Sequence, residues 1–162
     1  MIRHINYGEL WSPYYQDWRD PYTEEEAWRK HEQKEYYTAL VTEEDGATVA
    51  VELCFAGTYC NLYFHDALGR NAVSYTYELT ADGRLFLCGC ARTQFQDTNR
   101  LGSSGIAYSY TQDGRRKTFV SMNRQLSVPA DNEPVDVSTH FVAVPPFRQW
   151  EPLLHHARNH PP

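Results

Sequence analysis

The chain lacks the features that define several large classes of protein. No stretch approaches the roughly 18 apolar residues that a membrane-spanning helix needs. The opening residues, MIRHINYGEL, contain neither the apolar core nor the cleavage site of a signal peptide. No cluster of Lys and Arg forms a basic stripe, and the densest basic run, at 115–117, falls at an expected turn. We therefore expect a cytoplasmic chain with no membrane partner and no nucleic-acid partner.

The sequence also lacks the short motifs of the common cofactor-dependent enzymes. It has no Walker loop, no G-x-G-x-x-G, no H-E-x-x-H and no G-x-S-x-G. Its four cysteines, Cys54, Cys60, Cys88 and Cys90, do not have the spacing of a zinc ribbon or finger. We expect free, mostly buried thiols, and we predict no metal and no cofactor.

Tyrosine is abundant instead. Aromatic residues make up 14% of the chain, with twelve Tyr, and the net charge is −6. Because Tyr has an apolar ring and a polar tip, this surplus indicates a half-wet cavity or an interface, although β-strands also favour Tyr. We expect one domain over 1–162, divided into an aromatic, irregular arm (1–22), a helical segment (23–35), a β-barrel or sheet (36–144) and a C-terminal tail (145–162) that frays after His156.

One helix start is clear in the sequence. Thr23 can accept a hydrogen bond from the next amides, and Glu26, three residues later, completes a capping box. Three consecutive Glu residues in the first turn suit the helix dipole. We predict a surface helix from Glu24 to Lys34.

Short segments with alternating apolar and polar residues fill the middle of the chain. Asp-Gly pairs at 45–46, 82–83 and 113–114 predict hairpin turns, since Gly tolerates positive φ. The predicted strands lie near 36–43, 47–55, 59–65, 72–79, 84–95, 105–111, 116–122 and 135–142. A meander of about eight strands can close into a small barrel, so we expect a mainly β, antiparallel, lipocalin-like closed or half-closed barrel. A strongly bent open sheet with a helix on one face is the competing architecture.

Glu78, His65 and His140 are the candidate catalytic residues. Tyr63 and His65 share one face of a predicted strand, and burial of Glu78 in an otherwise apolar strand would raise its pKa. Either side chain would then suit proton transfer near neutral pH. Asp136 and His140 fall on one face of the last predicted strand, so both could contact the same ligand. The competing interpretation is that these are polar positions on the solvent side of the sheet.

Aromatic side chains are the candidate walls of a cavity. The predicted ligand-binding residues are Tyr63, Tyr75, Tyr77, Tyr108, Tyr110, Phe95 and Asp136. The first functional hypothesis is a barrel that binds a small apolar or aromatic compound, as a carrier or as a cofactor-free cyclase, isomerase or lyase. The second is an acidic protein-binding module, such as an inhibitor or immunity protein, with a basic partner and no catalytic activity. An enclosed cavity favours the first, and a filled core with an exposed aromatic patch favours the second.

Overall fold

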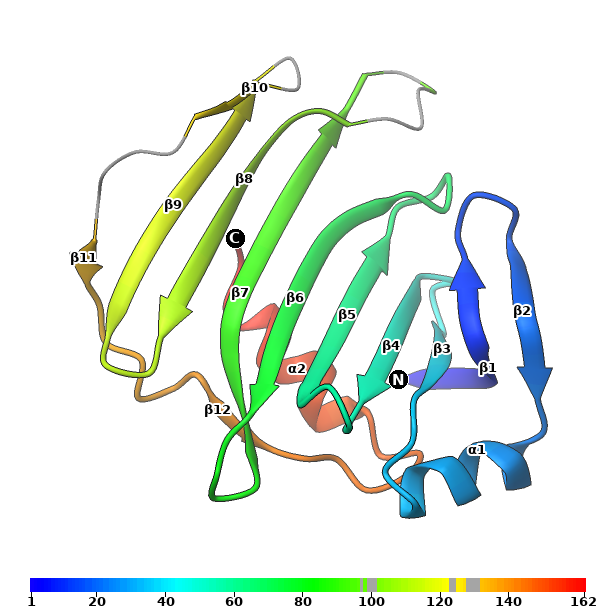
Figure 1. Ribbon diagram of the computed structural model, residues 1–162. Coiled ribbons are helices and arrows are strands. Elements are labelled where there is room, and N and C mark those ends of the chain that lie inside the picture. The colour runs from blue at the N-terminus through cyan, green and yellow to red at the C-terminus, as the bar shows by residue number, and fades with distance from the viewer. Residues whose placement is uncertain (97, 99–101, 123–124, 128–131) are drawn as a thin grey trace.

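The computed structural model of the chain consists of one large antiparallel sheet and two short helices (Figure 1). It describes residues 1–96, 98, 102–122, 125–127 and 132–162. The strands are β1 (Ile2–Ser12), β2 (Asp17–Tyr22), β3 (Tyr37–Glu43), β4 (Thr48–Cys54), β5 (Tyr59–His65), β6 (Asn71–Leu79), β7 (Arg84–Phe95), β8 (Gly102–Thr111), β9 (Arg115–Met122), β10 (Gln125–Ser127), β11 (Glu133–Pro134) and β12 (Phe141–Ala143). The helices are α1 (Glu24–Glu32) and α2 (Glu151–Arg158).

The sheet is open. Its strands follow the order β10-β9-β8-β7-β6-β5-β4-β3-β1-β2, while β11 pairs with β9 and β12 pairs with β7. In the described part of the chain, the two ends of this path do not pair with each other. The predicted mainly β antiparallel meander is confirmed, but the barrel does not close. A closed barrel would require the last strand to pair with the first. Instead, β12 pairs with the N-terminal part of β7, where Phe141 lies opposite Phe86.

The strand predicted over 135–142 is wrong. Residues 135–140 turn instead, because the Asp136 carboxylate accepts a hydrogen bond from the Ser138 amide at 2.8 Å and the His140 amide donates to the Val137 carbonyl at 3.0 Å. Such a local bond from an Asp side chain competes with strand pairing. Only Phe141–Ala143 remains extended and paired.

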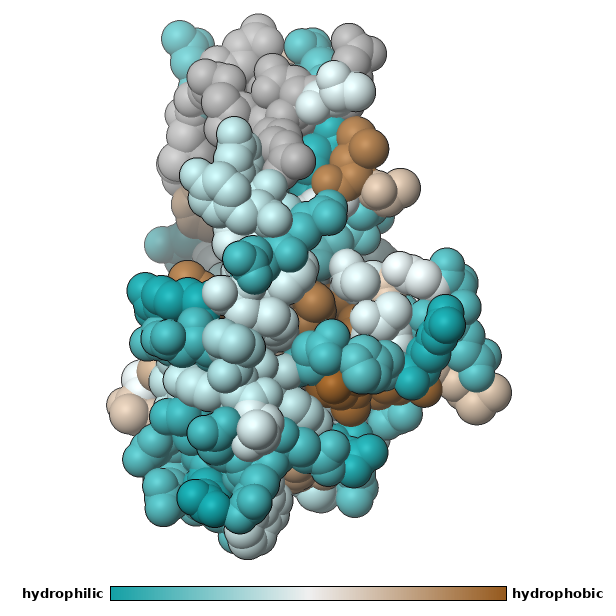
Figure 2. Space-filling view, turned by 90° about the vertical axis from the view of Figure 1, so that its right-hand side faces the viewer, coloured by the Kyte–Doolittle hydropathy of each residue, from teal (hydrophilic) through white to brown (hydrophobic). Residues whose placement is uncertain are grey.

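The expected irregular arm is a regular hairpin. Strands β1 and β2 pair antiparallel, with Tyr7 opposite Tyr22 and Trp11 opposite Trp18. The two prolines that suggested irregular structure are compatible with this arrangement. Pro13 lies in the turn, and Pro21 lies on an edge strand, where proline is tolerated. Figure 2 shows this side of the molecule as mostly hydrophilic, with hydrophobic residues gathered mainly in a recess at mid-height.

Helix α1 follows the sequence signals closely, whereas α2 extends further along the tail than expected. Thr23 and Glu26 form the predicted capping box, and α1 ends at Glu32, slightly before the expected Lys34, which has a positive φ of 56°. In the tail, α2 continues to Arg158 rather than fraying after His156. Burial of Leu153 and Leu154 against the sheet explains this, because packing of an apolar face stabilises a short helix more than its intrinsic propensity does.

The two faces of the sheet differ in composition. Helix α2 lies behind the middle of the sheet (Figure 1), against what we call the helix face. The helix face carries Val41, Val49, Val51, Leu62, Tyr75, Tyr77 and Leu87, which form one buried cluster with Leu153, Leu154 and Ala157. The opposite side, the open face, carries Leu40, Thr48, Glu52, Asn61, Tyr63, His65 and Thr76. The hydrophobic core therefore lies on one side of the sheet, and polar and aromatic groups lie on the other.

Candidate functional site

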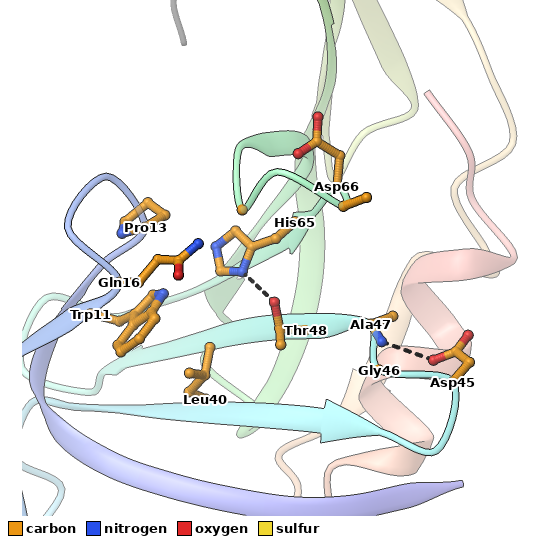
Figure 3. Close-up of a pocket in the computed structure, with 12 residues that line it drawn as sticks. Trp11, Pro13, Gln16, Leu40, Asp45, Gly46, Ala47, Thr48, His65 and Asp66 are labelled. Carbon is orange, nitrogen blue, oxygen red and sulfur yellow. Dashed lines mark hydrogen bonds between the residues drawn. The ribbon is translucent and has the colours of Figure 1, made fainter. Parts of the chain in front are cut away.

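A groove of about 590 Å³ lies on the open face, between the β1–β2 hairpin and strands β3 to β5 (Figure 3). The turns between β3 and β4 and between β5 and β6 form its rim. Its walls include Trp11, Pro13 and Gln16 from the hairpin and Leu40, Thr48 and His65 from the sheet. The β1–β2 hairpin thus faces strands β3 to β5 across a space large enough for a small molecule.

The hairpin is held over the open face by close contacts at a glycine. At Gly8 a Cβ atom would lie 2.3 Å from the Trp18 ring, so only glycine allows the indole to lie on the β1 backbone. Trp18 in turn packs edge-on against Trp11, with ring centroids 5.2 Å apart. The hydroxyl of Thr38 donates to the Glu9 carbonyl at 3.1 Å and fixes β1 to β3 below the groove.

The tip of the hairpin reaches the turn between β5 and β6. The position of a Cβ on Gly69 would lie 3.1 Å from Nε2 of Gln16 and 3.6 Å from the Pro13 carbonyl oxygen. Gly69 has a φ of 73°, which most other residues rarely adopt. The groove is therefore bridged at one end by the contact between these two turns.

His65 is the polar group that faces the groove. Its Nδ1 atom lies 3.0 Å from Oγ1 of Thr48, and its ring is next to Gln16 and Trp11 in Figure 3. Its Nε2 atom is buried and, among the described residues, makes no hydrogen bond of good geometry. Burial lowers the pKa of His65, although a hydrogen bond with the side chain of Asn71 and the charge of Asp66 act in the opposite direction. The lowered pKa favours the uncharged imidazole at neutral pH, in which one ring nitrogen donates and the other accepts a hydrogen bond.

The acidic residues at the rim are engaged in their own turns. Asp66 accepts hydrogen bonds from the amides of Leu68 and Arg70 and, at 2.7 Å, from Nε of Arg70. Although burial opposes it, these bonds lower the pKa of Asp66, which stays ionised. Asp45 similarly accepts the amide of Ala47 at 3.0 Å. Both carboxylates hold hairpin turns in place, so His65 is the better candidate to bind a ligand.

The aromatic residues predicted to line a cavity do not line one space. Tyr63 lies on the open face, whereas Tyr75, Tyr77, Tyr108 and Tyr110 lie on the helix face. Tyr75 and Tyr77 are almost fully buried, because α2 and the C-terminal segment fill the space that a closed barrel would have enclosed.

The outer pair of tyrosines packs against charged and imidazole groups. The Arg116 guanidinium lies over the ring of Tyr108, 5.2 Å from its centroid. Tyr110 packs edge-on against His140, with centroids 4.5 Å apart. Phe95, at the end of β7, is covered by the guanidinium of Arg70 at 4.3 Å.

The three candidate catalytic residues are also separated. Glu78 lies on the open face near the lower end of β6, where its carboxylate accepts a hydrogen bond from Gln112 at 2.6 Å. His140 is buried beside β7 and donates from Nδ1 to the Leu87 carbonyl at 3.2 Å. Asp136 is exposed and bonded within its own turn. Of the three candidates, only His65 lines the groove.

Sequence reasoning missed the hairpin half of the groove. Trp11 and Gln16 fall in the segment expected to be irregular, so their side chains were not assigned to any site. A usable signal was present, because Ile5 and Tyr7 alternate with His4, Asn6 and Gly8 before a turn that contains Pro13.

Within the described residues, no group of three or more His, Cys, Asp or Glu is placed to hold a metal ion. All four cysteines are free. No helix among the described residues is long and apolar enough to cross a membrane. The sequence matches no family model, no curated protein and no solved structure, so the geometry of the chain is the basis for assigning a function.

Proposed function

We propose that the groove beneath the β1–β2 hairpin binds an uncharged small molecule that has an aromatic or apolar part and one hydrogen-bonding group. The observation that carries the proposal is His65, which lines the groove and whose buried Nε2 atom makes no hydrogen bond of good geometry in the described part of the chain. A buried polar atom without a hydrogen bond is rare in folded proteins and is destabilising. A ligand that bonds to Nε2 would remove this deficit.

The walls of the groove support this class of ligand. Trp11 and Leu40 supply apolar surface, and the volume of about 590 Å³ falls within the range of small-molecule pockets. A neutral imidazole can donate or accept one hydrogen bond at Nε2, whereas an anionic ligand would favour the imidazolium that burial opposes. Binding as a carrier or sensor requires only these groups. Catalysis as a cyclase, isomerase or lyase would depend on His65 as the single proton-transfer group in the groove.

A fragment screen by NMR tests this proposal. Phenol, indole and nicotinamide serve as uncharged aromatic probes, and resonances of the Trp11 indole and the His65 ring report their binding. We expect Trp11→Ala and His65→Gln each to weaken binding about fivefold or more. The first removes the aromatic contact, and the second removes the hydrogen bond to the imidazole. Trp28→Ala is the matched control, because Trp28 is exposed on α1. Probes whose affinity is unchanged by both groove variants would refute the proposal.

An acidic protein-binding module is the second candidate, favoured by the tip of the hairpin. Tyr14 and Tyr15 are 59% and 76% exposed, and their rings pack edge-on with centroids 4.8 Å apart. Exposed tyrosines are typical of interface hot spots. The double substitution Tyr14→Ser and Tyr15→Ser should abolish binding to a purified basic partner while leaving fragment binding in the groove intact. A partner bound equally by the double variant would exclude this surface.

A further inference from the structure

A second group of polar and aromatic side chains lies on the open face, further along the same strands than the groove. Glu52 on β4 pairs directly with Asn61 on β5. Tyr59 and Tyr63 lie two residues to either side of Asn61 on the same strand, so all three side chains point to the open face. Tyr36 immediately precedes β3, whose Thr38 is the other neighbour of Glu52. Three tyrosines are thus arranged around one carboxyl group.

Within the described part of the chain, the carboxyl group of Glu52 has no cationic partner. It accepts a long hydrogen bond of 3.4 Å from Nδ2 of Asn61 and also interacts with the hydroxyl of Tyr63. Among the described residues, no ion pair includes Glu52. Eight other acidic residues each pair with Arg or Lys: Glu9, Glu24, Glu25, Glu35, Glu43, Asp66, Asp82 and Glu133. Burial of a carboxylate without a cationic partner is costly, and a bound cation would offset that cost.

The pKa values of Glu52 and Tyr63 agree with the lack of a cationic partner for Glu52. Burial raises the pKa of Glu52, and hydrogen bonds from Asn61 and Tyr63 offset this only in part. Burial and the nearby Glu52 raise the pKa of Tyr63 to about 12, so its hydroxyl stays neutral at physiological pH. The tyrosine side chains therefore place neutral, electron-rich rings near a carboxyl group whose ionised form a bound cation would favour.

We propose that Glu52, with the rings of Tyr36, Tyr59 and Tyr63, forms a binding site for a small organic ammonium ion. Ammonium groups are attracted both to carboxylates and to the faces of aromatic rings, and a set of tyrosines around one acid combines the two interactions. A hard metal ion is a poorer fit, because Ca²⁺ requires about six to eight oxygen ligands and Mg²⁺ about six. The proposal does not depend on ligand binding in the groove, which involves His65 rather than Glu52.

Choline and dimethylbutanol, its neutral analogue with carbon in place of the charged nitrogen, provide a direct test. NMR titration of the full chain should show choline perturbing the resonances of Glu52, Asn61 and Tyr63. We expect choline to bind roughly tenfold more tightly than the neutral analogue. Glu52→Gln keeps the shape of the side chain and should abolish this difference. Glu32→Gln is the control, because it makes the same charge change at an exposed position on α1.

Two further measurements distinguish this site from the groove. By linkage, saturating choline should lower the pKa of Glu52, which carbon NMR of its carboxyl group reports. Trp11→Ala and His65→Gln should leave choline affinity unchanged. The proposal is overturned if choline does not bind, if choline and its neutral analogue bind equally, or if Glu52→Gln retains the preference for choline.

Discussion

The same strands present a filled face to α2 and a polar, grooved face to solvent. Tyr77 on the helix face is fully buried and contacts the C-terminal helix, whereas Tyr59, on the neighbouring strand, is 38% exposed on the open face. The alternation of side chains along a strand shows which residues share a face, but it does not show which face is buried. What covers each face decides whether its tyrosines stabilise the fold or remain available to a ligand. We therefore expect a ligand to bind on the open face and not on the helix face, which α2 covers.

The largest expected effect comes from removing a tyrosine on the helix face. Tyr77→Ala leaves a cavity beneath α2 and should lower the free energy of unfolding by about 3 to 5 kcal/mol. Tyr59→Ala removes the same side chain from the open face and should change it by about 1 kcal/mol or less. Urea denaturation of both variants checks the comparison. Equal losses would show that the two faces contribute alike to stability.

A smaller effect is expected from Gly8→Ala, which acts on the hairpin that overhangs the open face. The new methyl group would meet the Trp18 ring at 2.3 Å, so the indole has to move. Overpacking of this kind costs about 1 to 3 kcal/mol. We also expect weaker fragment binding, because Trp11 packs on Trp18. Denaturation and the fragment titration measure the two effects, and a variant identical to wild type in both would contradict the role given to this contact.

Acidification should loosen the C-terminal segment from the helix face. His156 donates from Nε2 to the Thr139 carbonyl at 2.8 Å, so its Nδ1, 3.1 Å from the hydroxyl of Tyr77, accepts a hydrogen bond in the neutral ring. Burial, with help from His160 and His140, lowers the pKa of His156, although the bond to Thr139 raises it. The stacked ring of His160 lies 4.6 Å away, centroid to centroid.

The sign of the pH effect follows from this lowered pKa. Above the unfolded-state pKa of 6.5, both states are neutral and the full stability is present. As the pH falls below that value, the unfolded chain binds protons first, so stability should decrease. His156→Gln should reduce this dependence more than His155→Gln, at an exposed position on the same helix, does. Denaturation at several pH values distinguishes them.

The smallest effect is expected from Thr48→Val, which keeps the shape of the groove and removes the hydroxyl bonded to His65. Stability should change by about 1 kcal/mol, the typical value of one hydrogen bond. The imidazole of His65 would lose its hydrogen bond to Thr48, so it would be held less firmly and fragment affinity should fall a fewfold. Titration of the His65 ring by NMR and the fragment assay report both changes. Unaltered affinity would show that Thr48 does not orient the imidazole.

Local signals in the sequence predicted much of the fold. The capping box at Thr23 and the Asp-Gly turns mark element boundaries, because each depends on only a few neighbouring residues. Period-two alternation correctly grouped Val49 and Val51 on one face. Which face is covered depends on residues 151–158, about a hundred positions away in the chain, and alternation contains no such information.

The site was predicted less well, for the same physical reason. His65 was identified from its strand position, but its neighbours Trp11 and Gln16 come from a hairpin brought into contact by tertiary packing at Gly8 and Gly69. His140 and Asp136 were misplaced because a local side-chain bond turned the chain where a strand was expected. Contacts between distant segments set the site, and short patterns report only on near neighbours.

The most direct test of the account is the position of a bound aromatic fragment, determined by intermolecular NOEs on the wild-type protein. We predict NOEs from the fragment to the ring protons of Trp11 and His65 and none to those of Tyr75 or Tyr77. NOEs to Tyr75 or Tyr77 would place the ligand beneath α2 and contradict the assignment of binding to the open face.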